Sequence, residues 1–481
     1  MPAEQKKPLL WNYQLADDVF YVDKNLLAKR FPLRFFRLTD LSLQLITDLT
    51  RGWVPSPGSL AKTEQFAEYL AAQGVLVRGI NPVVADELPT ISVVITVKNR
   101  PGEIDSCLHS IKKSDYPAEK LEVIVIDGST DGETTAVIQR HGVKLIKPEP
   151  DPGLSACRNL GVKAASGDVI AFTDSDCEVN ESWLLTLSAC FRQQKTAFVG
   201  GGVLTKNPRS MIDQYETIRS PLFMGDRIEP VQKEGSVPYV PTCNLLIRRS
   251  VFEKLGGFNE QLSVGEDVDL IWRALEKGHK GWYVPGGFVW HHHRNKMPPF
   301  LRRRAQYAGS EALLNKHGHI VNKYLNIPRW HIPLLLAIFA SLYLGSAAVF
   351  AIVVPLMLLI ELLSKSSKLK GKGINIKLNV LARSILQSYR STLKYFSALL
   401  TRYYLWLLLL TALITWSLGG WVLLFIPLIS LMIEFPARNK HSLVLFFPLY
   451  LLEMFFYSLG FWSGCLRSGQ LKLLLLKVYF R

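Results

Sequence analysis

The sequence predicts an α/β protein in three parts: a small N-terminal domain, a central domain built on a parallel sheet, and a helical C-terminal region associated with a membrane. Short apolar runs alternate with helix-like segments between residues 91 and 176. Polar side chains follow directly after several of those runs. Long apolar runs flanked by lysine and arginine fill the last third. We place the domains at residues 1–80, 91–330 and 331–481, with a linker at 81–90.

The central domain contains four runs that we predict to be buried strands. The last of them, Val169–Thr173, is continuously apolar rather than alternating, as expected of a parallel strand covered on both faces. Helix-like segments at residues 104–113 and 156–165 lie between the four runs. Strands that alternate with helices at this spacing imply right-handed βαβ units and therefore a parallel sheet. The four runs are Ile91–Val97, Val123–Ile126, Val143–Ile146 and Val169–Thr173.

Two carboxylates follow the last of these strands. Asp174 and Asp176 are separated by Ser175 alone. Carboxylates this close repel one another, whereas Mg²⁺ or Mn²⁺ binds one or two carboxylates together with substrate phosphates. A solvated turn with two capping carboxylates is the alternative, and for an isolated Asp-x-Asp it is the commoner outcome.

Further polar groups fall at the same edge of the predicted sheet. Asn99 and Arg100 follow the first strand, and Asp127 follows the second. The carboxyl ends of parallel strands meet at one edge, where open α/β sheets bind ligands. The joint placement of these groups with Asp174 and Asp176 predicts a nucleotide site rather than a coincidence of turns.

Residues 91–183 resemble the inverting GT-A glycosyltransferases of family 2. The likeness rests on Val-Val-Ile-Thr-Val-Lys-Asn-Arg, Val-Ile-Asp-Gly-Ser-Thr-Asp, Gly-Leu-Ser-Ala-Cys-Arg-Asn and Asp-Ser-Asp. The family usually has two residues between the second strand and Gly-Ser, where this chain has one. The resemblance implies a Rossmann-like GT-A fold that uses Mg²⁺ or Mn²⁺. It implies nucleotide-sugar binding by Val97, Asn99, Arg100, Asp127, Arg158 and Asp174, and metal binding by Asp174 and Asp176.

A second acidic pair, Glu266-Asp267, begins a predicted helix. Apolar residues at positions 268, 271, 272 and 275 follow the spacing of one helix face. Carboxylates are stabilised at a helix N-terminus, so simple capping is one interpretation. The resemblance supplies the other, in which this catalytic pair holds the general base. We assign that base to Asp267, because an inverting transfer needs one carboxylate within reach of the acceptor hydroxyl.

Three consecutive histidines follow a predicted strand that ends near Val289. Adjacent residues on an extended chain point to opposite faces, so all three cannot easily bind one ion. The family often places a metal-ligating histidine here. The resemblance therefore points to His291, with His293 as the alternative on the same face; a purely structural pair is the third possibility.

Composition divides the chain into two parts of different character. The net charge is +16, but residues 300–481 hold 21 Lys/Arg and 4 Asp/Glu, which leaves 35 and 36 for the rest. The basic part is also the most apolar, a combination that nucleic-acid binders seldom have. Basic residues beside long apolar runs are typical of the cytoplasmic side of a membrane. We therefore expect a protein of the cell membrane with no nucleic-acid partner.

The catalytic domain is expected to be cytoplasmic. Residues 1–15 have no apolar core of signal-peptide length. The six cysteines are scattered, with no Cys-x-x-Cys pair, which argues against a disulfide framework or a zinc site of that kind and fits a reducing compartment.

The C-terminal apolar runs predict two hairpins. Each of Ile332–Leu363 and Tyr404–Phe435 has a glycine-containing break near its middle, and a single span needs about 20 residues. Between them, Leu381–Arg402 has the mixed character of an interfacial helix. The last run, Leu443–Gly464, is expected to be re-entrant or interfacial, because a crossing would leave the basic tail outside. A buried helical bundle is the alternative.

The N-terminal domain, residues 11–79, is predicted to be winged-helix-like, with two helices and short strands. Its 8 basic and 7 acidic residues lack the excess that a phosphate-backbone reader needs. Peptide capture on a helix or a strand edge is the better functional interpretation. A structural appendage is about equally plausible.

The whole chain resembles a narrower group, the mycofactocin-system glycosyltransferases. The likenesses are Pro-Leu-Arg-Phe-Phe-Arg-Leu-Thr from Pro32, Val-Pro-Tyr-Val-Pro from Val237, the segment Val264–Arg273, Leu-Arg-Arg-Arg from Leu301 and Tyr-Ser-Leu-Gly-Phe-Trp-Ser-Gly from Tyr457. The group implies a PqqD-like peptide-binding domain and a membrane-associated tail. It also implies hexose transfer, from UDP-glucose, to a peptide-derived redox cofactor. A lipid-linked or cell-surface polysaccharide acceptor is the first alternative, and a non-enzymatic membrane scaffold is the second.

Overall fold

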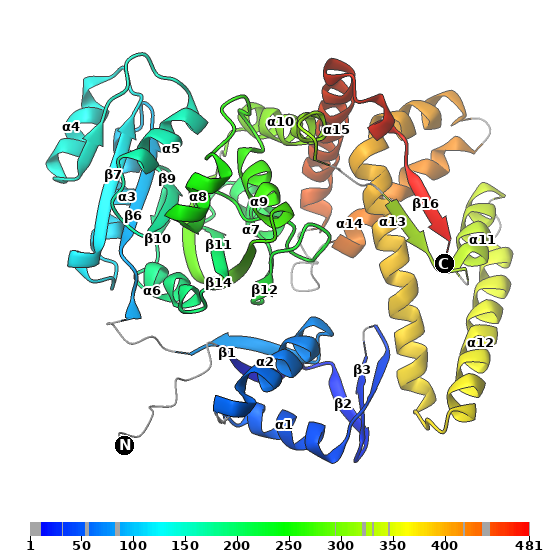
Figure 1. Ribbon diagram of the computed structural model, residues 1–481. Coiled ribbons are helices and arrows are strands. Elements are labelled where there is room, and N and C mark those ends of the chain that lie inside the picture. Colours follow the sequence, from blue (N-terminus) through cyan, green and yellow to red (C-terminus); the bar gives the residue numbers. More distant parts are fainter. Residues whose placement is uncertain are drawn as a thin grey trace. The chain divides into compact units, whose positions relative to one another are not determined.

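The computed structural model describes residues 11–30, 32–52, 57–81, 87–293, 295–319, 324–329, 331–344, 347–416, 419–434 and 443–480 (Figure 1). The chain divides into two compact units. The first comprises residues 1–14, 49–71 and 76–296, and the second residues 15–48, 72–75 and 297–481. Half of the predicted linker at 81–90, residues 82–86, lies outside the described residues.

The first unit is organised around one mixed sheet of nine strands, drawn from cyan to green in Figure 1. Its order is β10-β14-β11-β13-β9-β6-β7-β8, with β12 (Glu229–Pro230) paired to β14. The four predicted strands are β6 (Ile91–Val97), β7 (Leu121–Asp127), β8 (Lys144–Ile146) and β9 (Val169–Asp174). They are neighbours and all parallel, which confirms that part of the prediction.

The register of these parallel strands brings the predicted site residues to one edge. Val97 lies opposite Asp127 on one side of β6, and Thr96 lies opposite Asp174 on the other. Three strand ends therefore stop at the same level. Helices α3 (Pro101–Lys112), α4 (Gly132–Arg140) and α5 (Leu154–Lys163) connect them.

Helix α5 packs very closely on the sheet. A Cβ added at Gly161 would lie 2.3 Å from Val94 Cγ1, so only glycine allows this approach. Arg158 lies three residues earlier on the same helix face. The close contact therefore fixes how far Arg158 stands from the strand ends.

In the other half of the sheet the sequence predicted only the strand that ends near Val289, which is part of β14. β13 (Asn244–Arg248) runs antiparallel between β9 and β11 (Thr196–Thr205). β14 (Lys280–His291) is parallel to β11 and antiparallel to the short β10 (Cys177–Val179). The sheet is therefore mixed. α6 (Trp183–Ser188), α7 (Met211–Arg219), α8 (Arg249–Leu255) and α9 (Glu266–Glu276) complete this region.

The core of this unit lies between the sheet and its helices. Phe172 on β9 contacts Phe252 and Phe258 at centroid distances of 5.6 and 5.2 Å. Leu270 and Ile271 of α9 are fully buried in the same cluster. Burying such side chains stabilises the fold by about 1.5–3 kcal/mol each. The start of α9, with its acidic pair, is thus anchored to the sheet.

The N-terminal residues form two small sheets. β1 (Trp11–Leu15) pairs with β5 (Leu76–Ile80), and β2 (Val19–Asp23), β3 (Leu26–Lys29) and β4 (Arg34–Arg37) form an antiparallel sheet. The two predicted helices are α1 (Asp40–Thr50) and α2 (Pro57–Ala72). Ile46 and Leu49 of α1 are buried, whereas Leu41 is 66% exposed.

The second unit contains the predicted apolar helices. The first hairpin is α11 (His331–Tyr343) followed by α12 (Ala347–Gly371), and part of the predicted break between them lies outside the described residues. The predicted interfacial helix does not end at Arg402. It continues as α13 (Leu378–Ile414), a single helix of 37 residues, because the segment contains neither glycine nor proline. After Gly419 the chain continues with α14 (Phe425–Glu434).

Within the described residues of this unit, two helices are long and apolar enough to cross a membrane, by length and composition alone. They are α13 and α15 (Leu443–Ser468). α15 packs against α10 (Met297–Lys316), and the Arg304 Nε and Glu453 Oε1 atoms of these two helices lie 3.0 Å apart. β15 (Tyr324–Ile327) pairs in parallel with β16 (Lys477–Phe480). The re-entrant or interfacial placement of residues 443–464 stays a prediction.

Candidate active site

The first two strand ends are joined by Asn99. Its backbone has φ 53°, in the left-handed region, and its main-chain N–H donates to Ser129 Oγ at 2.8 Å. Its side-chain oxygen accepts hydrogen bonds from the main-chain N–H groups of Thr130 (2.9 Å) and Asp131 (3.3 Å). Asparagine tolerates this backbone conformation better than most residues. Asn99 therefore shapes the loop at which the nucleoside is expected.

Asp127 is fully buried, and each of its carboxylate oxygens accepts a hydrogen bond. Oδ1 accepts from the Ser129 main-chain N–H at 2.9 Å, and Oδ2 accepts from Thr135 Oγ1 at 2.6 Å. A carboxylate placed in this way holds the turn after β7 together. Its predicted contact with nucleotide stays a prediction, and reaching a base would require it to exchange these bonds.

Asp176 is paired with Arg100, the residue that precedes α3. Arg100 Nη1 lies 2.5 Å from Asp176 Oδ2. Burial on its own raises the pKa of Asp176, but His291 and Arg100 outweigh it, so the pKa lies below its ordinary value. The carboxylate is ionised and available to a cation.

His291 reaches Asp176 because of strand pairing. β10 and β14 are in register with Cys177 opposite His291, and the His292 main-chain N–H donates to the Asp176 carbonyl at 2.9 Å. His291 Nε2 lies 3.6 Å from Asp176 Oδ1. Asp176, Cys177 and His291 each offer a ligand atom, all within 4.8 Å of one another.

The donor set at this edge fits the expected metal. An aspartate oxygen and an imidazole nitrogen converge, and the Asp174 carboxylate, 31% exposed, lies two residues before Asp176 at the end of β9. The buried His291 Nδ1 has no hydrogen-bond partner among the described residues. Carboxylate and imidazole together suit Mn²⁺, and carboxylate alone suits Mg²⁺.

The other two histidines point to different neighbours. His292 Nε2 lies 2.9 Å from Glu178 Oε1, on the opposite face of the strand. The ring centroids of His291 and His293 are 4.7 Å apart. The two rings lie on the same side of the chain, as expected for residues two apart on an extended segment. His293 Nδ1 lies 4.0 Å from Glu216 Oε2. His291 therefore has the more direct access to Asp176.

Arg158 links the two acidic motifs. Its Nη2 lies 2.8 Å from Asp174 Oδ1 and its Nη1 lies 2.8 Å from Glu266 Oε1, with only 4% of the side chain exposed. Burial lowers the pKa of Arg158, but the opposing effect of Asp174 and Glu266 is larger, so the pKa lies above its ordinary value. The guanidinium fork matches two carboxylates at once. Its predicted contact with nucleotide sugar stays a prediction.

The carboxylates at the start of α9 differ in their surroundings. Glu266 is buried and held by Arg158. Asp269 is buried and paired with Arg273, whose other nitrogens donate to the carbonyls of Leu255 and Gly257. Asp267 is half-buried, and its Oδ1 accepts from the Val268 main-chain N–H at 2.8 Å. Of the three, Asp267 is the most accessible to a substrate.

Two buried cysteines, Cys177 and Cys243, lie beside these carboxylates. A hydrogen bond with Cys177 lowers the pKa of Cys243, whereas burial and the carboxylates of Asp174, Asp176 and Asp267 raise it, and the net shift is upward. Neither cysteine was singled out by the sequence, where the two are remote from each other.

The loop at residues 236–244 is largely internal. Val237 and Val240 are fully buried in the core. Asn244 is also buried: its Nδ2 donates to the carbonyls of Gly202 and Gly287, and its Oδ1 accepts from Trp183 Nε1 at 2.7 Å. These contacts give this loop a structural role in joining β13, β11 and β14.

The mixed sheet of the first compact unit carries acidic residues along one edge. Residues 92–256 match the family described as glycosyl transferase family 2, which confirms the resemblance seen in the sequence. The match covers this segment of the first compact unit.

More particular relatives extend beyond the matched domain. The chain is 32% identical over 231 residues to the pre-mycofactocin glycosyltransferase of Mycobacterium tuberculosis, which covers 47% of each protein. It is 30% identical over 201 residues to glycosyltransferase AglE of Haloferax volcanii, covering 40% of this chain and 63% of that protein. The chain thus spans about half the length of the first of these relatives.

Among solved structures, the mannosyltransferase PcManGT from Pyrobaculum calidifontis, in complex with GDP-Man and Mn²⁺, aligns with 17% identity and a TM-score of 0.44. The alignment covers 78% of this chain and 88% of that one. This likeness is too distant to transfer any residue's role.

Proposed function

We propose that this protein is a membrane-associated inverting glycosyltransferase that moves a hexose, glucose from UDP-glucose, to a peptide-derived redox cofactor in mycofactocin maturation. The family match supports the reaction type, and the identity to the Mycobacterium tuberculosis enzyme supports the acceptor class. The arrangement of the carboxylates supports the assignment of roles.

The observation that carries the proposal is the Asp174–Arg158–Glu266 chain of ion pairs. It ties the strand end that meets the donor to the helix start that meets the acceptor. Because Arg158 engages Glu266, the neighbouring Asp267 is left as the general base. Asp267 would take the proton of the acceptor hydroxyl as that oxygen attacks the anomeric carbon from the face opposite the leaving diphosphate.

On the donor side, Asp174, Asp176 and His291 would hold the divalent cation. When bound, Mg²⁺ or Mn²⁺ neutralises charge that develops on the leaving diphosphate. Asn99 and the turn at Ser129 and Thr130 would shape the nucleoside pocket. Arg100 is 37% exposed and paired with Asp176. When the cation replaces Arg100 as the partner of Asp176, the guanidinium would move toward the diphosphate oxygens.

On the acceptor side, the N-terminal strands would capture the peptide-derived part of the substrate. In the β2-β3-β4 sheet, β2 and β4 are the edges among the described strands. A peptide can extend such a sheet by adding one strand through main-chain hydrogen bonds.

A lipid-linked or cell-surface polysaccharide acceptor is the second candidate. The observation in its favour is that α13 and α15 are long and apolar enough to cross a membrane. The pairing of buried Arg158 with two acids argues against a third possibility, a scaffold without activity, since a scaffold has no need of buried charge at a strand edge.

The test uses the full-length protein in detergent. Purified protein is given a panel of nucleotide sugars with Mn²⁺, and transfer to a peptide-derived acceptor and to a lipid acceptor is measured by mass spectrometry. We expect UDP-glucose to be used with the peptide-derived acceptor. Deleting residues 1–79 should abolish that transfer and leave hydrolysis of the donor by water unchanged. Transfer to lipid alone, unaffected by the deletion, would overturn the acceptor assignment.

A further inference from the structure

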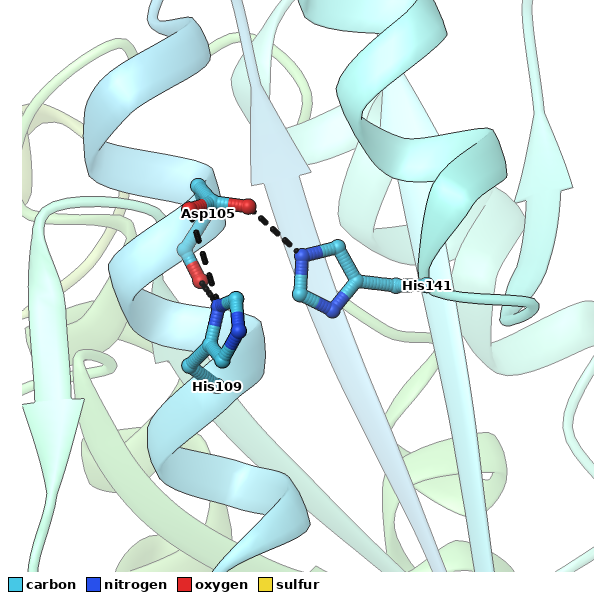
Figure 2. Close-up of side chains that lie close together, drawn as sticks. All are labelled: Asp105, His109 and His141. Carbon is cyan, nitrogen blue, oxygen red and sulfur yellow. Dashed lines mark hydrogen bonds and ion pairs between the residues drawn. The ribbon is translucent and has the colours of Figure 1, made fainter.

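A second cluster of metal-ligating side chains lies away from the carboxylate edge. Asp105 and His109 are one helical turn apart on α3, and His141 is the C-cap of α4. Figure 2 shows the three side chains turned toward one another from the two helices. Each offers one ligand atom, and these atoms all lie within 4.8 Å of one another.

The contacts within this cluster centre on the Asp105 carboxylate. His141 Nε2 lies 2.8 Å from Asp105 Oδ1, and His109 Nδ1 lies 3.6 Å from Asp105 Oδ2. The two imidazole rings are perpendicular, with centroids 4.8 Å apart. Tetrahedral Zn²⁺ with bonds of 2.0–2.1 Å needs ligand atoms about 3.3 Å apart. Metal binding therefore requires a small shift of the His109 side chain, which is 62% exposed.

The hydrogen bond of His109 prepares its ring for a metal. His109 Nδ1 lies 3.0 Å from the main-chain carbonyl oxygen of Asp105, so it donates its proton there. The lone pair is then on Nε2. Metal-bound histidines commonly donate their other ring N–H to a carbonyl in this way, which fixes the tautomer and the ring orientation.

Burial and charge favour a cation at this position. The side chain of His141 is 5% exposed, and its Nδ1 has no hydrogen-bond partner among the described residues, so Asp105 alone holds the ring. His141 also lies at the C-terminus of α4, where the helix dipole stabilises positive charge. Asp105 and His109 are open to solvent at 43% and 62%, which gives an ion a path of entry.

We propose that Asp105, His109 and His141 bind one Zn²⁺ ion, with water in the fourth position, and that this ion clamps α3 to α4. The donor set separates this site from the catalytic one. Two imidazoles and one carboxylate select Zn²⁺ over Mg²⁺, which prefers oxygen ligands. The clamp stabilises the two helices that begin at Pro101 and Gly132, next to the expected nucleoside loops.

The experiment measures Zn²⁺ retained by the full-length protein after stripping with a chelator and dialysis against micromolar Zn²⁺ in excess Mg²⁺. We expect one Zn²⁺ per chain, retained by Asp176→Asn and by His279→Gln, a histidine outside the cluster. His109→Gln and His141→Gln should each lose it. Because His141 is buried and could be needed for folding, His109→Gln is the decisive variant.

Co²⁺ substitution gives a second readout. The wild type should show the intense visible absorption of four-coordinate Co²⁺, and Zn²⁺ should raise its melting temperature by several degrees. His109→Gln should show neither effect. Zn²⁺ retention equal in wild type and His109→Gln, or no retention by the wild type, would mean that the cluster is only a hydrogen-bonded link between two helices.

Discussion

Replacing Arg158 with methionine tests the link between the two acidic motifs. Methionine fills a similar volume but leaves Glu266, 10% exposed, buried without its partner. Breaking one side of a buried ion pair is destabilising by about 3–5 kcal/mol. We expect about 3 kcal/mol, because Asp174 is 31% exposed and water can replace part of its interaction.

The assay is thermal unfolding of the full-length protein followed by near-UV circular dichroism. For a domain of roughly 200 residues, 1 kcal/mol corresponds to about 2–4 °C, so the melting temperature should fall by roughly 6–12 °C. Adding Glu266→Gln to Arg158→Met removes the orphaned charge and should recover part of the loss. The control is Arg140→Met, an exposed arginine at the end of α4.

The result that would refute this reasoning is a fall no larger than that of Arg140→Met. A second contradiction would be a double variant less stable than Arg158→Met alone, since the two charges would then not be coupled through this contact.

Three further predictions follow from the same structure. Asp176→Asn should sharply weaken Mn²⁺-dependent donor binding in calorimetry while melting near the wild-type temperature; full affinity in that variant or in excess EDTA would exclude the metal role. A chain ending at Lys296, where the first compact unit ends, should no longer sediment with membranes, and unchanged sedimentation would remove the anchor assigned to the later helices. Burial raises the pKa of Glu122, but hydrogen bonds from Ser92 and Ser166 outweigh it and lower the pKa. The stability that ionised Glu122 contributes at pH values above its ordinary pKa is therefore lost as the pH falls through the lowered pKa. In Glu122→Gln, the melting temperature should depend less on pH between pH 5 and pH 3 than it does in the wild type.

The parallel half of the sheet could be predicted because its strands are mainly apolar and polar residues follow them. Register then follows from the βαβ connections, which bring Val97, Asp127 and Asp174 to one edge. β13 gave no such signal. Its apolar run is only Leu245–Ile247, too short to be distinguished from a buried loop, and its antiparallel direction depends on partners remote in sequence.

Helix ends in the apolar region were predicted from changes in hydropathy, which is why α13 was divided in error. Arg383, Arg390 and Arg402 mark a change of environment along this helix, not an interruption of its hydrogen bonds. The break at Gly419 was predictable, because glycine adopts the left-handed backbone found there, with φ 84°.

Individual site residues could be named from the sequence, but their partners could not. Arg158 and Glu266 are 108 positions apart, and nothing local indicates that they meet. The Asp105–His109–His141 cluster was missed for the same reason: one turn of α3 supplies two ligands and the end of another helix supplies the third.

The central claim is that Asp267 is the general base of a sugar transfer. The most direct measurement is the rate of transfer by Asp267→Asn, with Glu266→Gln as the comparison and donor affinity measured for both. Asparagine keeps the shape of the side chain and caps a helix about as well as aspartate, but it cannot accept the acceptor's proton. We predict that transfer falls by roughly 10²–10⁴-fold with donor affinity unchanged. A rate within a few-fold of wild type, or a larger loss in Glu266→Gln, would contradict the assignment.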